Sequence, residues 1–203
     1  MPSEVDLANL ALSRLGEEPI IAVDDETVAG VRIGRLLPSV RDYVLRLDTW
    51  RCCLKRVQIP ALAQAPLGYS KSFPLPNDFL KLVALRLERY KDWSLVGNNI
   101  NTDFEEGPLE ILYVFREDDT NKYSPELYDV MAWRLAFELS GFVSTSTVRK
   151  QETFELYQNA LMNAVNLNAL ENPVTQIVNS TWVDARYTNI DRGLYGDSFY
   201  TVG

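Results

Sequence analysis

The sequence predicts an α+β fold: a four-helix-type bundle with a small, mostly antiparallel β-sheet inserted between the second and third helices. Apolar residues recur at helical spacing in residues 1–50 and 124–172, whereas residues 51–118 show the alternation of short strands. After Pro173 neither period continues, which predicts an extended C-terminal arm over 173–203. We therefore expect one domain over residues 1–172, followed by this arm.

The first helix is expected to begin after Ser3, a good N-cap, since acidic residues follow it where the backbone N–H groups are free. Gly16 is expected to end this helix, and Pro19 prevents its resumption. The predicted apolar stripe consists of Leu7, Leu10, Ala11 and Leu15.

A second, longer helix is expected to open at Asp24-Asp25-Glu26-Thr27, where helix capping explains the acidic residues better than a metal site does. Pro38 lies inside its pattern, so we expect a kink or two abutting helices. The predicted stripe consists of Val28, Val31, Leu36 or Leu37, Val40, Tyr43, Val44 and Leu47.

The middle of the chain has the signals of short strands and turns. Cys53, Val57 and Ile59 alternate with polar residues before Pro60, and Ala61 to Ser72 reads as a loop. Four further segments are predicted to form strands or hairpin arms. They are residues 83–88, the pair 93–96 and 100–104 around Gly97-Asn98-Asn99, and residues 110–116, which are apolar on both faces and suit a central strand.

A pair of helices follows between Ser124 and Asn172. Ser124-Pro125-Glu126 is a strong helix start, and the helix after it is apolar around most of its circumference, so it should be buried on several sides. Thr147 is expected to cap the last helix, which carries two apolar stripes. The first consists of Phe154, Tyr157, Leu161 and Val165, and the second of Leu156, Ala160, Leu167 and Leu170. Either both stripes pack internally, or the second meets a neighbouring copy of the protein.

The composition excludes several classes of function. The 203 residues include no histidine, which removes Ser-His-Asp and Cys-His nucleophiles and His-containing metal sites. Cys52 and Cys53 are adjacent, and we expect them to be small, partly buried residues on a strand. A net charge of −8 argues against tight wrapping of nucleic acid. We expect no secretion signal and no membrane helix.

Only acidic clusters could support catalysis. Glu105-Glu106 and Glu117-Asp118-Asp119 could supply the paired carboxylates of a glycoside hydrolase, although both lie in turn-like sequence where solvated acids are common. No phosphate-binding glycine motif is present. We therefore expect no cofactor, no metal and no enzymatic activity.

The arm after Pro173 combines a polar composition with large aromatic residues and Arg186. A disordered tail is usually poor in aromatic residues, whereas aromatic residues and Arg are enriched at interfaces. A partner-binding arm is thus favoured over a disordered tail. The aromatic residues are Trp182, Tyr187, Tyr195, Phe199 and Tyr200.

Short motifs spread over residues 1 to about 172 resemble the head-to-tail adaptors of short-tailed bacteriophages, also called tail tubular protein A or gatekeeper-type adaptors. The order of elements is the same: a helix, a long helix ending in a Trp, a small sheet and a helical pair. The motifs are Leu15-Gly16-Glu17-Glu18-Pro19-Ile20; Arg41-Asp42-Tyr43-Val44-Leu45-Arg46 with Trp50; Leu75-Pro76-Asn77-Asp78-Phe79-Leu80-Lys81-Leu82; and Ser124-Pro125-Glu126-Leu127 with Ala132 and Ala136.

The resemblance implies a twelve-fold ring in the virion neck, assembled in the host cytoplasm, between the portal protein and the tail nozzle (tail tubular protein B). DNA would pass through it without specific binding, and no membrane partner is expected. The resemblance implies that the arm contacts the portal, and the composition of the arm assigns this contact to Trp182, Arg186, Tyr187, Tyr195 and Phe199. The second apolar stripe, Leu156, Ala160, Leu167 and Leu170, would contact a neighbouring subunit, and Asn98 and Asn99 would face the nozzle or lumen. Two alternatives remain: a phage glycan hydrolase, and a tail terminator or completion ring protein.

Overall fold

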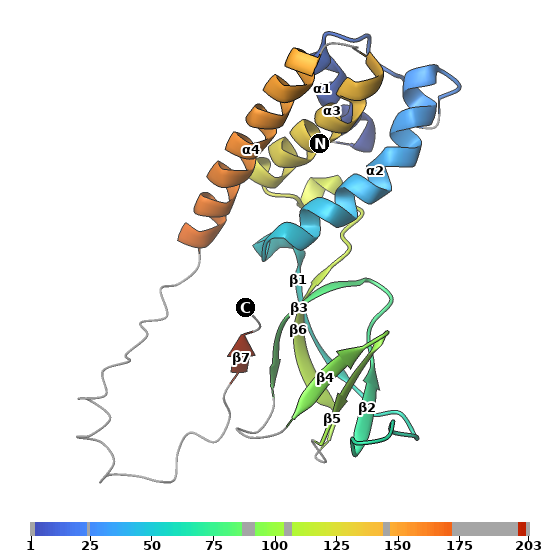
Figure 1. Ribbon diagram of the computed structural model, residues 1–203, viewed down its shortest axis with the longest axis vertical. Helices are drawn as coiled ribbons and strands as arrows, with labels where there is room; N and C mark the ends of the chain where they lie inside the picture. Colours follow the sequence, from blue (N-terminus) through green and yellow to red (C-terminus); the bar gives the residue numbers. More distant parts are fainter. Residues whose placement is uncertain are drawn as a thin grey trace, which may run out of the picture. The chain divides into compact units, whose positions relative to one another are not determined.

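The computed structural model describes residues 3–23, 25–86, 92–103, 107–143, 147–171 and 199–201, and its fold is α+β, as predicted (Figure 1). The helices are α1 (Glu4–Leu15), α2 (Val28–Leu47), α3 (Pro125–Val143) and α4 (Thr147–Leu170), with 3-10 turns η1 (Arg51–Cys53) and η2 (Thr120–Lys122). The strands are β1 (Leu54–Ile59), β2 (Lys71–Pro74), β3 (Phe79–Arg86), β4 (Trp93–Val96), β5 (Asn99–Thr102), β6 (Leu109–Phe115) and β7 (Phe199–Thr201).

The chain divides into two compact units. The first contains Met1–Leu54 and Val114–Glu171, and the second contains Lys55–Tyr113 and Asn172–Gly203. All four helices belong to the first unit, and most of the strands belong to the second. None of the helices described is long and apolar enough to cross a membrane.

Helix α1 begins and ends where its sequence predicts. The Ser3 hydroxyl accepts a hydrogen bond from the Asp6 backbone N–H at 3.1 Å, and the Asp6 carboxylate accepts one from the Ser3 N–H at 2.8 Å, which completes a capping box. Gly16 ends the helix in the left-handed conformation, with φ of 75°. One residue of the predicted stripe differs, because Leu10 is only partly buried whereas Ala8 and Leu12 are fully buried.

Helix α2 is continuous through Pro38, which excludes the second of the two predicted alternatives, a pair of abutting helices. It begins after Thr27, whose hydroxyl accepts a hydrogen bond from the Gly30 N–H at 3.1 Å, while Asp24 lies outside the described residues. The predicted stripe was also partly wrong, since Val28, Val31, Tyr43 and Leu47 are exposed. The buried face instead consists of Gly30, Ile33, Leu37, Val40, Arg41, Val44 and Leu45.

The chain after α2 is fixed by Trp50. Its side chain is 1% exposed, and the indole N–H donates to the Val44 carbonyl at 2.9 Å, which satisfies the one polar atom of a buried tryptophan. Cys52 and Cys53 follow in η1 rather than on the predicted strand, and β1 begins only at Leu54. The two thiols are free, with Cys53 buried and Cys52 partly buried.

The strands form two sheets rather than the single sheet predicted. One has four strands in the order β1-β6-β3-β7, and the other has three in the order β2-β5-β4. Strand β6 lies between β1 and β3 and is buried at alternate positions, which confirms the prediction of a central strand. Strand β2 of the smaller sheet begins inside the segment that was expected to be a loop.

Residues 87–91 and 104–106, including Glu88, Glu105 and Glu106, lie outside the described residues.

The turn before β3 ties three strands of the larger sheet together. The Asp78 carboxylate accepts hydrogen bonds from Lys55 of β1 at 2.9 Å and from the Tyr113 hydroxyl of β6 at 2.8 Å. Burial alone would raise the pKa of Asp78, but these two hydrogen bonds lower it below its ordinary value. The Tyr113 ring stacks on Phe79 with ring centroids 5.7 Å apart.

Helix α3 is the core of the helical unit. It contacts α1, α2 and α4, which confirms the prediction that it is buried on several sides. Its partly exposed aromatic residues are covered by side chains from neighbouring helices: Arg14 of α1 lies 4.1 Å from the Trp133 ring, and Phe154 of α4 packs on Phe137. The buried α3 residues are Leu127, Val130, Met131, Ala132, Leu135, Ala136, Leu139 and Ser140.

Truncating a buried α3 leucine tests this core. Leu127 is 0% exposed, so Leu127→Ala should lower the free energy of unfolding by about 2–5 kcal/mol through lost burial and a residual cavity. Leu170→Ala is the matched control, because Leu170 is 79% exposed, and its effect should stay within about 0.5 kcal/mol. Urea unfolding of dilute protein measures both. Equal losses for the two variants would contradict this description of the core.

Candidate functional site

Helix α4 uses one side for its own unit. Tyr157 and Ala164 are buried there, and the Phe154 and Phe137 rings lie 5.1 Å apart. At the far end, the Asn168 amide donates to the Asp48 carboxylate at 2.9 Å and to the Thr49 carbonyl at 3.0 Å. These contacts fix the helix over most of its length. They also determine which residues of α4 face away from the unit.

The other side of α4 is an exposed, largely apolar surface. Leu156 and Leu167 are each 46% exposed and Leu170 is 79% exposed, while Ala160 is partly buried at the border with the inner side. With 100° per residue, these four positions fall within a sector of about 80°. We define the outer face of α4 as these residues with the exposed residues beside them, Asn159, Met162, Asn163 and Asn166.

The outer face of α4 is also free of charge. The stretch from Leu156 to Leu170 contains no Asp, Glu, Lys or Arg, although these make up 24% of the chain. A solvated helix face normally carries such residues, and their depletion is characteristic of the centre of protein interfaces. This signal was readable in the sequence, but the prediction used only the apolar spacing. It therefore missed Met162, which is 64% exposed.

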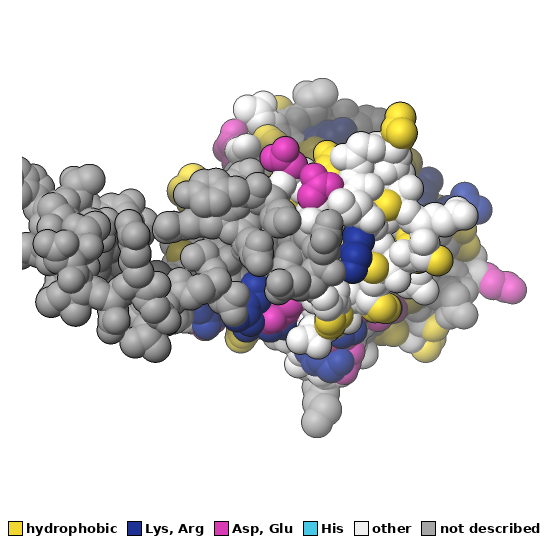
Figure 2. Space-filling view, turned by 90° about the horizontal axis from the view of Figure 1, so that it is seen from below, with side chains coloured by type: hydrophobic (Ala, Val, Ile, Leu, Met, Phe, Trp, Pro, Cys, Tyr) yellow, Lys and Arg dark blue, Asp and Glu magenta, His cyan; other side chains and the backbone are white. Residues whose placement is uncertain are grey.

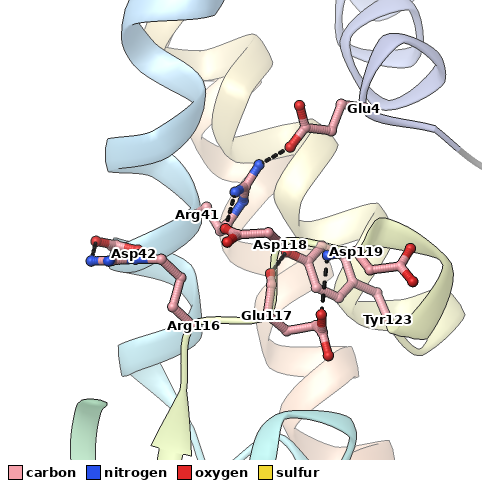
Figure 3. A network of polar contacts seen from close by, with 8 residues as sticks. All are labelled: Glu4, Arg41, Asp42, Arg116, Glu117, Asp118, Asp119 and Tyr123. Atoms are coloured by element: carbon pink, nitrogen blue, oxygen red, sulfur yellow. Dashed lines mark hydrogen bonds and ion pairs between the residues drawn. The ribbon is translucent and has the colours of Figure 1, made fainter. Parts of the chain in front are cut away.

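A second candidate is a network of charged residues around Arg41 (Figure 3). The Arg41 side chain is 10% exposed and pairs with Glu4 of α1 and with Asp118. Burial would lower the pKa of Arg41, but the Tyr123 phenol and the carboxylates of Glu4 and Asp118 raise it above its ordinary value. The guanidinium therefore joins α1, α2 and the segment after β6.

The Glu117-Asp118-Asp119 cluster is part of this network. Glu117 is 6% exposed and its carboxylate accepts a hydrogen bond from Lys122 at 3.0 Å, while its backbone carbonyl accepts one from the Tyr123 hydroxyl at 2.6 Å. Asp119 caps η2 by accepting from the Asn121 N–H at 3.0 Å. Hydrogen bonds from the Asn121 side chain and backbone lower the pKa of Asp119.

This geometry favours a structural role for the cluster. Each of the three carboxylates has a cation or a backbone N–H as its partner, and a general acid requires a carboxyl group whose pKa is raised. The other predicted carboxylates, Glu105 and Glu106, lie outside the described residues. Within the part of the chain that the structure describes, no three Cys, Asp or Glu side chains are grouped so that they could hold a metal ion.

The predicted hairpin is present between β4 and β5. Val96 pairs with Asn99, so Gly97 and Asn98 form the turn, and Gly97 has a φ of 59°. Asn98 is exposed and Asn99 partly buried. Figure 2 shows that hydrophobic side chains on the molecular face it presents are scattered among polar and charged ones. Among the described residues, no contact distinguishes Asn98 and Asn99 as a binding site.

The predicted portal contacts fall largely outside the described residues. Trp182, Arg186, Tyr187 and Tyr195 all lie there, and only the backbone of Phe199 is placed, in β7. No protein-family model matches this chain, and no curated protein sequence matches it. The candidate sites therefore depend on the geometry of this chain alone.

Replacing Arg41 tests the charged network. Arg41→Met keeps the aliphatic stem and removes both ion pairs, so the free energy of unfolding should fall by about 1–3 kcal/mol. The loss stays moderate because Glu4 and Asp118 are 40% and 69% exposed and can be hydrated again. Arg116→Met removes the more exposed pair with Asp42 and should cost at most about 1 kcal/mol. Urea unfolding compares them, and a larger loss for Arg116→Met would contradict the assignment.

Proposed function

We propose that this chain is a non-enzymatic structural protein of a short-tailed phage virion. Copies of it form a twelve-fold ring that joins the capsid portal protein to the tail nozzle, and DNA passes through the ring during ejection without specific binding. The observation that carries the proposal is the outer face of α4, which is exposed for most of its residues, largely apolar and free of charge. Such a surface fits permanent association better than exposure to solvent.

The order of elements supports the resemblance to head-to-tail adaptors. The strands β1 to β6 lie between α2 and α3 in the sequence, and Trp50 follows the long second helix. In the proposed function, the four helices form the ring-building bundle and the sheets form an insertion within it. The charged network around Arg41 stabilises this body.

A head-to-tail ring requires two different, complementary surfaces on each subunit. The outer face of α4 is proposed as one of them. The exposed side of α2 is a candidate for the other, because Val28 is 67% exposed and Val31 is 41% exposed. An excess of acidic residues elsewhere suits a conduit that DNA must slide through, since carboxylates repel phosphate.

Charge introduced on the outer face of α4 tests self-association. Leu156→Glu and Leu167→Glu would bury unpaired carboxylates in the interface, so the fraction of assembled protein should fall at least about tenfold. Leu62→Glu is the matched control, since Leu62 is 45% exposed against 46% for Leu156 and Leu167. Native mass spectrometry, with and without portal protein, reports the assembled states.

Two outcomes would contradict the proposal. One is a wild-type chain that stays monomeric even when portal protein is present. The other is assembly that Leu156→Glu and Leu62→Glu weaken equally, because the outer face of α4 would then have no special role. Circular dichroism should confirm that each variant is folded, as is expected for substitutions at exposed positions.

Truncation after Pro173 tests the proposed contact of the arm with the portal. The shortened chain loses β7 from the edge of the larger sheet but should keep a cooperative unfolding transition, because α1 to α4 and β1 to β6 all precede the cut. It should lose binding to the portal in a co-sedimentation assay, since the aromatic residues and Arg186 are removed. Normal binding by the truncated chain would contradict the role of the arm. Self-assembly without any affinity for portal would favour a tail completion ring protein.

A further inference from the structure

The exposed side of α2 carries positive charge on an acidic chain. We define the outer face of α2 as Val28, Val31, Arg35 and Arg46, which are all exposed and fall within a sector of about 60° at 100° per residue. Asp42 lies in the same sector, but its carboxylate already pairs with Arg116. Neither Arg35 nor Arg46 has an ion-pair partner in the part of the chain that the structure describes. The outer face of α2 thus offers two unpaired guanidinium groups beside exposed apolar side chains.

The outer face of α4 continues into two acidic residues at the N-terminal end of the helix. Glu152 lies eighteen residues, or five turns, before Leu170 and therefore on the same line along the helix. Glu155 is about one turn further on, and both side chains are exposed. Among the described residues, neither carboxylate pairs with a cation, and Arg149 and Lys150 at the start of the helix each have another interaction. Two unpaired carboxylates therefore precede the charge-free stretch of α4.

The two outer faces point away from each other within one copy. Figure 1 shows α3 between the N-terminal halves of α2 and α4, and α3 packs against both helices. Each helix turns its buried side inward, so each outer face is directed away from α3. The two faces therefore do not meet within one chain. Head-to-tail association of copies would bring one against the other, since such a contact joins two different surfaces.

The spacing of charged and apolar residues fits one alignment of the two helices. Arg35 follows Val31 by four residues, and Leu156 follows Glu152 by four, which is about 6 Å along each helix axis. Antiparallel helices can therefore place Val31 against Leu156 while Arg35 meets Glu152. A parallel alignment with the same ion pair would place Leu156 beside Ser39 instead. The antiparallel alignment thus matches apolar residues and charged residues at the same time.

From this complementarity of charge and spacing, we infer that the outer face of α2 is the docking site for the outer face of α4 of a second copy. The two helices are antiparallel, and Arg35 of one copy lies beside Glu152 of the other. The inference rests on the self-association proposed above and identifies the surface that receives α4. Apolar contact supplies most of the attraction, because exposed ion pairs contribute little. The ion pair fixes the alignment, since like charges brought together at an interface are unfavourable.

Reversing the charge on each face tests this docking. Arg35→Glu brings carboxylates together at the proposed contact, and Glu152→Arg brings guanidinium groups together there. Each variant alone should therefore assemble at least about tenfold less than the wild-type chain. An equal mixture of the two variants should recover assembly, because copies that alternate meet only with opposite charges at each contact. Native mass spectrometry of the full chain, with and without portal protein, measures the assembled fraction and the ratio of the two variants in it.

Arg46→Glu is the matched control for position along the helix. It reverses a charge on the same face, but eleven residues and so about 16 Å beyond Arg35. Its loss of assembly should be smaller than that of Arg35→Glu, and Glu152→Arg should gain no assembly from being mixed with it. Equal recovery of Glu152→Arg by both arginine variants would overturn the proposed alignment.

The remaining outcomes separate this docking from the proposed function. Single variants that both assemble as well as the wild-type chain would overturn the docking and leave self-association intact. Impaired variants that do not recover when mixed would also overturn it. A wild-type chain that stays monomeric, even with portal protein, would overturn both. If Arg35→Glu or Glu152→Arg loses its cooperative unfolding transition, Arg32→Glu with Glu155→Arg provides a second pair in the same alignment, and the same outcomes decide.

Discussion

The all-round burial of α3 is the constraint on which the helical unit depends. A helix that is apolar around most of its circumference cannot be stable against solvent, so it requires partners on several sides. Helices α1, α2 and α4 supply them. Because α4 packs on α3 with one side only, Leu156, Leu167 and Leu170 on the opposite side stay exposed in the part of the chain that the structure describes. The outer face of α4 is therefore an exposed, largely apolar surface that packing within one copy does not explain.

The charged network extends the same principle to polar groups. Arg41 is nearly buried within an otherwise apolar face of α2, where its charge would be costly without partners. Glu4 and Asp118 neutralise it and thereby connect segments that are distant in sequence. The Glu117-Asp118-Asp119 cluster, which could suggest catalysis in the sequence, has a structural role instead. Its carboxylates accept hydrogen bonds from Arg41, Lys122 and a backbone N–H group.

Local signals in the sequence predicted local structure well. Ser3 and Gly16 bound α1 because a cap is recognised by its own chemistry, and the Gly97-Asn98 turn follows from the same logic. Predictions of structure that depends on residues distant in the sequence were less accurate. The predicted stripe of α2 omitted Ile33, which is buried, because the partners that bury a helix face are distant in sequence. The division into two sheets likewise depends on the long-range pairing of β2 with β5. The partners of Asp118 and Asn168 were unpredictable for the same reason.

Charge decides where copies of such a chain can meet. With a net charge of −8, two copies repel each other over most orientations, and the repulsion is weakest where acidic residues are absent. The stretch from Leu156 to Leu170 is such a region, and apolar contact there adds attraction where repulsion is least. This proposed contact therefore uses the interaction that an acidic chain still has available for self-association.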